Sequence, residues 1–210
     1  MIILLSKPQS FFIIFTSIFL FVLIAIVLIF FFYRIYVKHH FKNICYKKIY
    51  KFVLYNDYYL INDYSFNIDD KKMGHIDHII FGDKFIYLIN DSYYEGDLSG
   101  NYDDASFVYF SKKGTKQYTD NPIQQSKNLL SRLSMSIAVD GSLMIGITLV
   151  NNSCHISLKS NSKQFYIMQL KNLSALIKAI ESRNIPSINP KQLEHAVGAI
   201  YKLNKNKKDK

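Results

Sequence analysis

The 210-residue sequence has little glycine, proline or cysteine and no tryptophan, with 8 Gly, 4 Pro and 2 Cys. This composition excludes collagen-like and broadly disordered chains, and two cysteines are too few for a disulfide-stapled scaffold. Acidic residues are also scarce, because 16 Asp and Glu stand against 26 Lys and Arg and leave a formal net charge of +10. The basic excess therefore needs an explanation.

Metal-binding and redox motifs are not indicated by the cysteines. Cys45 and Cys154 are far apart in the sequence and form no C-x-x-C pair. The six histidines are scattered, and His39-His40 lie among lysines where contact with a lipid headgroup is the simpler interpretation. No resident cofactor is expected from these patterns.

One long apolar stretch is present. Residues 11–33 read FFIIFTSIFLFVLIAIVLIFFFY and carry no charge. At about 1.5 Å of rise per residue, a helix of this length crosses the ~30 Å hydrocarbon core of a bilayer. A cleavable signal peptide has an apolar region of about 7–15 residues followed by small residues, whereas here Tyr33 and Arg34 follow directly. Residues 11–33 are therefore predicted to be an uncleaved transmembrane helix after a short tail at residues 1–10.

Basic residues are distributed unevenly around this stretch. Only Lys7 precedes it, whereas six basic and no acidic residues lie within 34–51. Because Lys and Arg flank the cytoplasmic side of a span, the sequence predicts a single-pass protein of the cell membrane with residues 34–210 in the cytoplasm. Both basic flanks of the chain predict contact with anionic lipid. Residues 52–190 hold 13 basic and 14 acidic side chains, so the net charge does not imply nucleic-acid binding, which stays open.

The cytoplasmic part divides by composition into three segments. Residues 34–56 are interpreted as a basic juxtamembrane linker, 57–185 as one domain, and 186–210 as a C-terminal helix with a Lys-rich tail. Apolar runs predict strands at residues 64–68, 76–81, 84–89, 105–111, 143–150 and 164–168, with a polar loop at 95–104, and the β character is expected to continue at 116–118. Helices are predicted at residues 122–138, 173–182 and 190–203, the first and last after Asn-Pro pairs. The pattern is typical of an α/β or α+β domain with a mixed sheet and flanking helices.

Three motifs in this layout carry a resemblance. Residues 76–80 read IDHII on a predicted strand, residues 85–96 read FIYLINDSYYEG, and residues 121–125 read NPIQQ at the start of a helix. In this order and spacing they resemble the nuclease-related domain (NERD), a branch of the PD-(D/E)XK nuclease-like fold, over about residues 60–170. The resemblance implies a nuclease-like mixed sheet. It also implies a family whose members are commonly bacterial and often joined to membrane spans.

The resemblance further implies a divalent-metal site. The Asp of the Asp-His pair and the Glu of a Glu-x-Lys would be the ligands, the Lys would face the attacked phosphate, and the Gln would support them. Asp77 and Gln125 match this pattern, but Asn90 and Ser92 stand at the Glu and Lys positions. An amide and a hydroxyl supply neither charge that such a site needs. Asp77 would be the remaining metal ligand, and the retained positions are expected to be vestigial.

Structural roles are also open for the retained residues. Asp77 beside His78 suits a hydrogen-bonded pair at a strand start, and Gln125 is expected near the apolar face of its helix, aimed at the sheet. Asp91 is adjacent to Asn90, but strand alternation points its carboxylate away from Asp77 unless a bulge re-aims it.

Three functions follow from these interpretations. The first is a membrane-anchored, catalytically degenerate NERD-like domain that acts as a binding or scaffolding module without a cofactor. The second is an active nuclease using Mg²⁺ or Mn²⁺ in a rearranged site of Asp77, Asp91 and a relocated lysine, Lys84 or Lys127. The third is a generic membrane-surface adaptor. The sequence identifies no protein partner.

Overall fold

The computed structural model describes residues 7–69, 72–112, 114–159 and 162–204. The expected tails at residues 1–10 and 186–210 therefore lie partly outside the described residues. The chain divides into two compact units, residues 1–41 and residues 42–210. One helix, α1 (Lys7–Asn56), passes from the first unit into the second. The domain limits expected from sequence, at residues 57 and 185, stay a prediction.

The first unit is the apolar part of α1. Residues Ile14–Tyr33 are long and apolar enough to cross a membrane, and none of this stretch is buried within the protein. Length and composition alone also fit a signal sequence near the N-terminus. Among the residues that the structure describes, this is the one helix long and apolar enough for a membrane.

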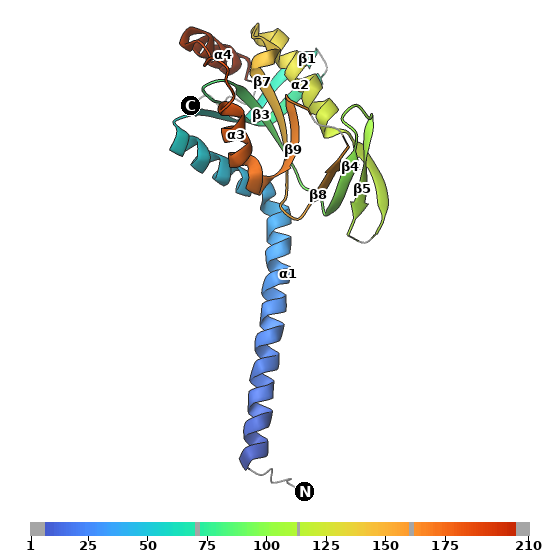
Figure 1. Cartoon of the computed structure of the whole chain (residues 1–210). Helices are drawn as coiled ribbons and strands as arrows, with labels where there is room; N and C mark the ends of the chain where they lie inside the picture. The colour runs from blue at the N-terminus through green and yellow to red at the C-terminus, as the bar shows by residue number, and fades with distance from the viewer. Residues whose placement is uncertain (1–6, 70–71, 113, 160–161, 205–210) are drawn as a thin grey trace. The chain divides into compact units, whose positions relative to one another are not determined.

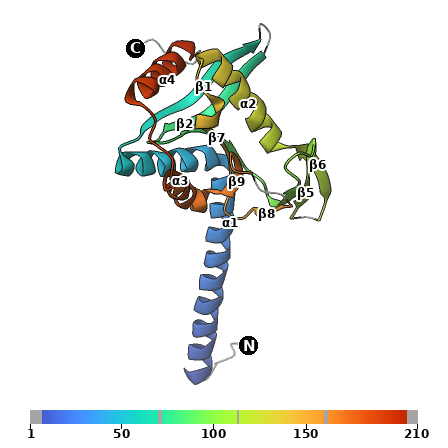
Figure 2. The same ribbon diagram turned by 45° about the horizontal axis from the view of Figure 1, so that its top comes forward.

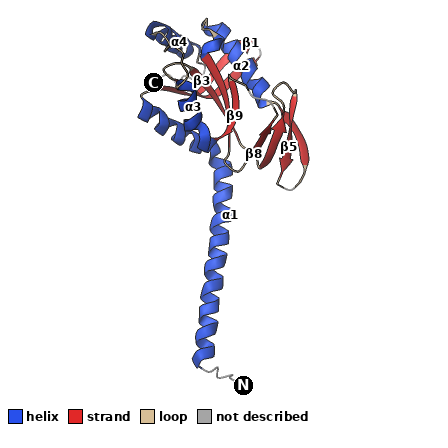
Figure 3. Ribbon diagram, viewed as in Figure 1, coloured by secondary structure: helices blue, strands red, loops and turns tan. Residues whose placement is uncertain are grey.

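The second unit contains two mixed sheets (Figures 1 and 3). The larger sheet has the order β1-β2-β3-β7-β9, with β1–β3 antiparallel and β3, β7 and β9 parallel. Its strands are β1 (Tyr59–Asp69), β2 (Lys72–Phe81), β3 (Ile86–Ser92), β7 (Met144–Val150) and β9 (Phe165–Gln169). The smaller sheet has the order β6-β5-β4-β8. Its strands are β4 (Gly96–Gly100), β5 (Ser106–Ser111), β6 (Lys116–Asp120) and β8 (His155–Leu158).

Helices cover both faces of the larger sheet. Helix α2 (Pro122–Ile137) packs on β7 and β9, and the last part of α1 reaches β2 and β3 from the other side (Figure 2). The remaining elements are η1 (Gly141–Leu143), η2 (Leu170–Asn172), α3 (Leu173–Glu181) and α4 (Pro190–Leu203). Helix α2 begins as the sequence predicts, because the Asn121 side chain accepts a hydrogen bond from the Ile123 amide and Pro122 needs no donor of its own.

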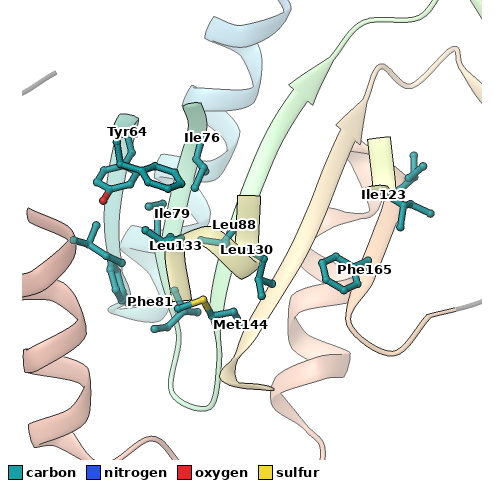
Figure 4. Packing of buried hydrophobic residues seen from close by; sticks show 14 of the residues in the cluster. Tyr64, Ile76, Ile79, Phe81, Leu88, Ile123, Leu130, Leu133, Met144 and Phe165 are labelled. Carbon is teal, nitrogen blue, oxygen red and sulfur yellow. The ribbon is translucent and has the colours of Figure 1, made fainter. Parts of the chain in front are cut away.

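The main core lies between the larger sheet and the helices α2 and α4. It is built from fully buried aromatic and aliphatic side chains (Figure 4), among them Tyr64, Phe66, Ile76, Ile79, Leu133 and Ile200. On the other side, the inward positions of α1 between residues 42 and 56 are buried, namely Cys45, Ile49, Phe52 and Val53. Burial of a side chain of this size contributes roughly 1.5–3 kcal/mol, so residues 42–56 are held by packing as part of the folded unit.

The α/β fold class is confirmed, and so are the strands and helices predicted from apolar runs and Asn-Pro pairs. Two strands differ from the prediction. Residues 96–100, expected in a loop, form β4, and β8 was not expected. Both are short, and β4 has the sequence GDLSG, which lacks the β-branched and aromatic residues of a typical strand. Residues 96–100 form a strand because they pair with β5. The two backbones approach so closely that a Cβ at Gly96 would lie 1.9 Å from the Phe110 carbonyl oxygen.

Candidate functional site

The candidate site lies where β2 and β3 separate. The two strands pair from Phe81↔Ile86 to His78↔Ile89, and β3 continues beside β7 as far as Ser92. Beyond the pair His78↔Ile89, β2 and β3 are joined by hydrogen bonds between backbone amides and side chains. The Asp77 amide donates to Asn90 Oδ1 at 3.2 Å, and the Asp91 amide donates to Asp77 Oδ2 at 2.8 Å.

The neighbouring strand β1 is irregular at the same level. Its residues Asn62 and Tyr64 pair with His78 and Ile76, and between them Asp63 adopts a φ of 53°. A non-glycine residue in this left-handed region is uncommon and marks local strain. The kink lies opposite Asp77 and accompanies the change from backbone pairing to side-chain pairing.

The second oxygen of Asp77 is held by two cationic or potentially cationic groups. Lys42 Nζ donates to Asp77 Oδ1 at 2.7 Å, and His75 Nε2 lies 3.2 Å from the same oxygen. Burial alone would raise the pKa of Asp77, but the hydrogen bond from Lys42 and those from the Asp91 amide and His75 outweigh it, so the pKa is lowered. The same bond raises the pKa of Lys42. Asp77 is therefore an ionised carboxylate with both oxygens occupied.

A second, deeper group lies next to it. His78 Nε2 is 2.9 Å from Asp91 Oδ2, and His78 Nδ1 is 2.6 Å from Asn62 Oδ1. The Asp91 side chain is 0% exposed, and burial raises its pKa although His78 acts in the opposite direction. Asp91 Oδ1 accepts no conventional hydrogen bond from the described residues, and the Cys45 thiol lies beside this carboxylate. Burial, and then the charge of Asp91, raise the pKa of Cys45.

Asp77 and Asp91 share more of their surroundings than the alternation of strand side chains predicts. Helix α1 reaches both of them, with Lys42 at Asp77 and Cys45 at Asp91. The charge of Asp77 contributes to the raised pKa of Asp91. The pairing of β3 with β7 is regular through Asp91, so the two aspartates are linked by the hydrogen bond from the Asp91 amide to Asp77 Oδ2 and not by a bulge in β3. The site is thus one connected polar network rather than two isolated faces.

Asn90 and Ser92, which stand at the Glu and Lys positions of the family pattern, both contact other residues of the fold. Asn90 is half-buried and uses its carbonyl oxygen to accept the Asp77 amide, as described above. Ser92 is also half-buried. Burial raises the pKa of Tyr94, and hydrogen bonds with Thr119 and Ser92 partly offset the increase. Both side chains therefore have partners within the fold.

Three further residues named from sequence lie elsewhere. Gln125 is exposed, with its amide 3.5 Å from Asp120 Oδ2, so the expectation that it points at the sheet is wrong. The buried positions of α2 are Pro122, Ile123, Ser126, Leu130, Leu133 and Ile137, which turn residue 125 aside and put Ser126 inward, 3.4 Å from the Thr148 hydroxyl. Neither candidate lysine contacts the site. Lys84 Nζ donates to the Arg183 carbonyl at 2.6 Å, and Lys127 Nζ lies over the Tyr102 ring.

The donor set does not fit a divalent cation. Within the described ranges, no group of three or more His, Cys, Asp or Glu side chains could hold a metal ion. A hard cation such as Mg²⁺ needs several oxygen ligands around it. Here Asp77 Oδ1 already binds an ammonium group 2.7 Å away, and the Asn90 oxygen is turned to a backbone amide.

Sequence reasoning missed Lys42 as a site residue, because it counted there only as one of the basic residues that set membrane orientation. Lys42 is 35 residues from Asp77, and no local pattern links the two. Asn62 and His75 were also missed, because both lie outside the three motifs that carry the resemblance. No local sequence pattern pointed to any of the three residues.

Comparison with protein families shows a similarity over part of the chain. The family model described as nuclease-related domain, NERD, matches residues 41–150 of this chain. The matched segment covers just over half of the chain and includes Lys42, Asp77, Asn90 and Asp91. No curated protein and no solved structure matches the sequence.

Proposed function

Because the chain belongs to the nuclease-related domain (NERD) family, we propose that it is a membrane-anchored member of this family whose domain does not hydrolyse nucleic acid and acts as a binding or scaffolding module. The membrane part of the proposal rests on the apolar helix Ile14–Tyr33. The bias of basic residues towards its C-terminal side favours a single-pass protein with its domain in the cytoplasm.

The ion pair between Lys42 and Asp77 is the observation that carries the proposal. An ammonium group sits 2.7 Å from the one carboxylate that the family pattern retains. A divalent cation about 4 Å from this ammonium would be repelled by about 8 kcal/mol at an effective dielectric constant of about 20, twice the value for two unit charges. Lys42 is 66% exposed, so solvent screens part of this repulsion. The shortage of oxygen ligands remains even if Lys42 swings away.

The test is a cleavage assay on the full chain in detergent micelles. Single-stranded DNA, double-stranded DNA and RNA are incubated with Mg²⁺ or Mn²⁺, and Asp77→Ala is compared with wild type. We expect cleavage at background level in both proteins. The matched control is Asp103→Ala, whose side chain is 83% exposed and far from the site in sequence. Metal-dependent cleavage that disappears in Asp77→Ala and persists in Asp103→Ala would overturn the proposal.

The runner-up is an active nuclease with a rearranged site. The adjacency of the Asp77 carboxylate and the Asp91 amide, 2.8 Å apart, favours it over other active arrangements. It would need Asp77 to leave Lys42 and Asp91 to leave His78, and Mg²⁺ or Mn²⁺ to take their places. The same assay separates the two functions, since Asp91→Asn would abolish cleavage only in an active enzyme.

The third function, a generic membrane-surface adaptor, differs in what it requires of the domain. An adaptor needs the anchor and the basic segments, whereas a NERD-specific module needs the surface around β2 and β3. Pull-down of partners with wild type and with a Lys42→Glu variant distinguishes them, because a change at the site should alter only a site-specific interaction.

A further inference from the structure

The last part of α1 has two opposite faces. At about 100° per residue, Cys45, Ile49 and Phe52 share one side, and all three are buried. The opposite side carries Lys47, Tyr50, Lys51 and Leu54, flanked by Tyr46 and Tyr55. We call these six outward residues the outer face of α1.

The outer face combines positive charge with large apolar surface. Lys47 and Lys51 are exposed, and the nearest acidic residue along the chain is Asp57. Tyr50 is 51% exposed, Leu54 69% and Tyr55 77%. The Lys51 ammonium lies over the Tyr55 ring at 5.9 Å, and the rings of Tyr46 and Tyr50 stack at 6.0 Å. Basic residues beside Tyr and Leu are typical of helices that lie in the interface of an anionic bilayer.

The apolar surface continues onto β1. Tyr46, Tyr50, Leu54 and Tyr59 line a shallow groove of about 300 Å³, and Tyr59 is itself 64% exposed. The same groove also contains the exposed carboxylate of Asp57 and the amide of Asn62, so the surface is mixed and not purely apolar. Strand β1 is an edge strand of the larger sheet. Nucleic acid would use the lysines and tyrosines of such a surface but gains little from an exposed leucine. A lipid interface uses all three residue types.

The chain itself keeps this surface near a membrane. Lys42 follows Tyr33 by nine residues, and a residue spans at most about 3.3–3.6 Å. The start of the folded unit is therefore within about 30 Å of the end of a span, whatever the conformation between them. At this distance a weakly binding surface meets the lipid at high effective concentration.

We propose that the outer face of α1 docks on anionic lipid headgroups, with Lys47 and Lys51 as the charged contacts and Tyr50 and Leu54 as the residues that enter the interface. Docking would fix the orientation of the domain on the membrane. The ion pair at Asp77 lies on another side of the helix, because Lys42 and Cys45 face the sheet. Tyr46 alone joins the two regions, since its ring stacks with His78. The inference rests on the anchoring part of the proposed function and is independent of whether the site cleaves nucleic acid.

The absence of tryptophan allows a direct test. The full chain carrying Tyr50→Trp is reconstituted into vesicles of phosphatidylcholine alone, or with about one third phosphatidylserine, each also made with brominated chains. We expect the emission of the introduced indole to shift to the blue and to be quenched by brominated lipid, more strongly in anionic vesicles and less at high salt. The matched control is Tyr118→Trp on β6, where the tyrosine is 70% exposed and quenching should not depend on lipid charge.

Charge variants complete the test. In the Tyr50→Trp background, Lys47→Gln with Lys51→Gln should lower the ratio of docked to undocked protein by at least about tenfold, since each lysine near an anionic surface contributes on the order of 1 kcal/mol. Lys112→Gln with Lys116→Gln, two exposed lysines near β5 and β6, should leave it unchanged. Circular dichroism checks that all variants are folded.

Each other outcome overturns the inference. Absence of quenching in the Tyr50→Trp chain, when that chain floats with the vesicles, removes the docking surface but leaves the anchor. If the chain does not float with the vesicles, both the docking surface and the membrane anchor are ruled out. If quenching is equal in neutral and anionic vesicles, recognition of anionic headgroups is ruled out. Retention of single-stranded DNA that needs Lys47 and Lys51, without quenching by lipid, assigns the surface to nucleic acid instead.

Discussion

At the scale of single residues, Lys42 controls the ionisation of Asp77. The lowered pKa of Asp77 means that the folded state binds its proton less tightly than the unfolded state, whose value is about 3.9. The pair therefore stabilises the fold above about pH 4, and this contribution is lost as the pH falls through the folded pKa.

Replacing Lys42 by Met should reverse this balance. Burial, the largest influence on Asp77, would then raise its pKa relative to wild type. We expect Lys42→Met to lower the free energy of unfolding by about 1 kcal/mol near neutral pH, a modest value because solvent screens an exposed ammonium. The difference should vanish at pH values where Asp77 is protonated in both proteins. Urea unfolding of the full chain in micelles, measured across pH, checks it, and a pH-independent difference, or one matched by Lys47→Met, would contradict it.

The same residue shows where sequence reasoning stops. Asp77, Asn90 and Ser92 could be identified from sequence because they lie within short motifs of fixed spacing. The partners of Asp77 could not, because Lys42 comes from a helix before the first strand, and an ion pair between distant segments leaves no periodicity. Gln125 was misassigned for a related reason. Counting from Leu129 shifts the apolar face of α2, whereas the packed positions centre on Ser126 and Leu133.

At the scale of elements, β4 depends on close packing rather than on propensity. A Cβ at Gly96 would lie 1.9 Å from the Phe110 carbonyl oxygen, so Gly96→Ala must push β4 and β5 apart. We expect a loss of about 1–3 kcal/mol, as for overpacked cores. The control is Gly198→Ala in α4, where nothing lies within 4 Å of the added Cβ and helix propensity predicts a gain of about 0.5–1 kcal/mol. Urea midpoints measure both, and equal signs for the two variants would contradict this account.

Elements with strong local signals were predicted well. Helices α2 and α4 begin at Asn-Pro pairs whose Asn side chains cap the first turn, and β7 is a continuous apolar run buried on both faces. Strands β4 and β8 pair in parallel between positions 58 residues apart, and β4 has a single apolar side chain, Leu98. Long-range pairing of this kind is set by the sheet that receives the strand, so a reading of local pattern cannot supply it.

At the scale of the whole molecule, the role of the apolar helix decides whether the domain stays attached to the membrane. A span keeps residues 1–41 attached to the domain, whereas a cleaved signal would release the domain from the membrane. The 23-residue apolar stretch exceeds the ~7–15 residues of a signal's apolar region. We therefore expect the expressed protein to keep its full mass of 24.5 kDa and to stay in the membrane fraction after carbonate extraction.

Orientation can be read in the same cells. A reporter that is active only in the cytoplasm, fused after Lys210, should be active, because six basic residues follow the span and Lys7 alone precedes it. Reversing the distribution of basic residues tests whether it sets the orientation. Adding lysines before residue 11 while replacing Arg34 and Lys38 with Gln should shift a fraction of the chains to the opposite orientation. A shorter, soluble product would assign residues 11–33 to a signal sequence, and the lipid-facing role of the outer face of α1 would fall with the anchor.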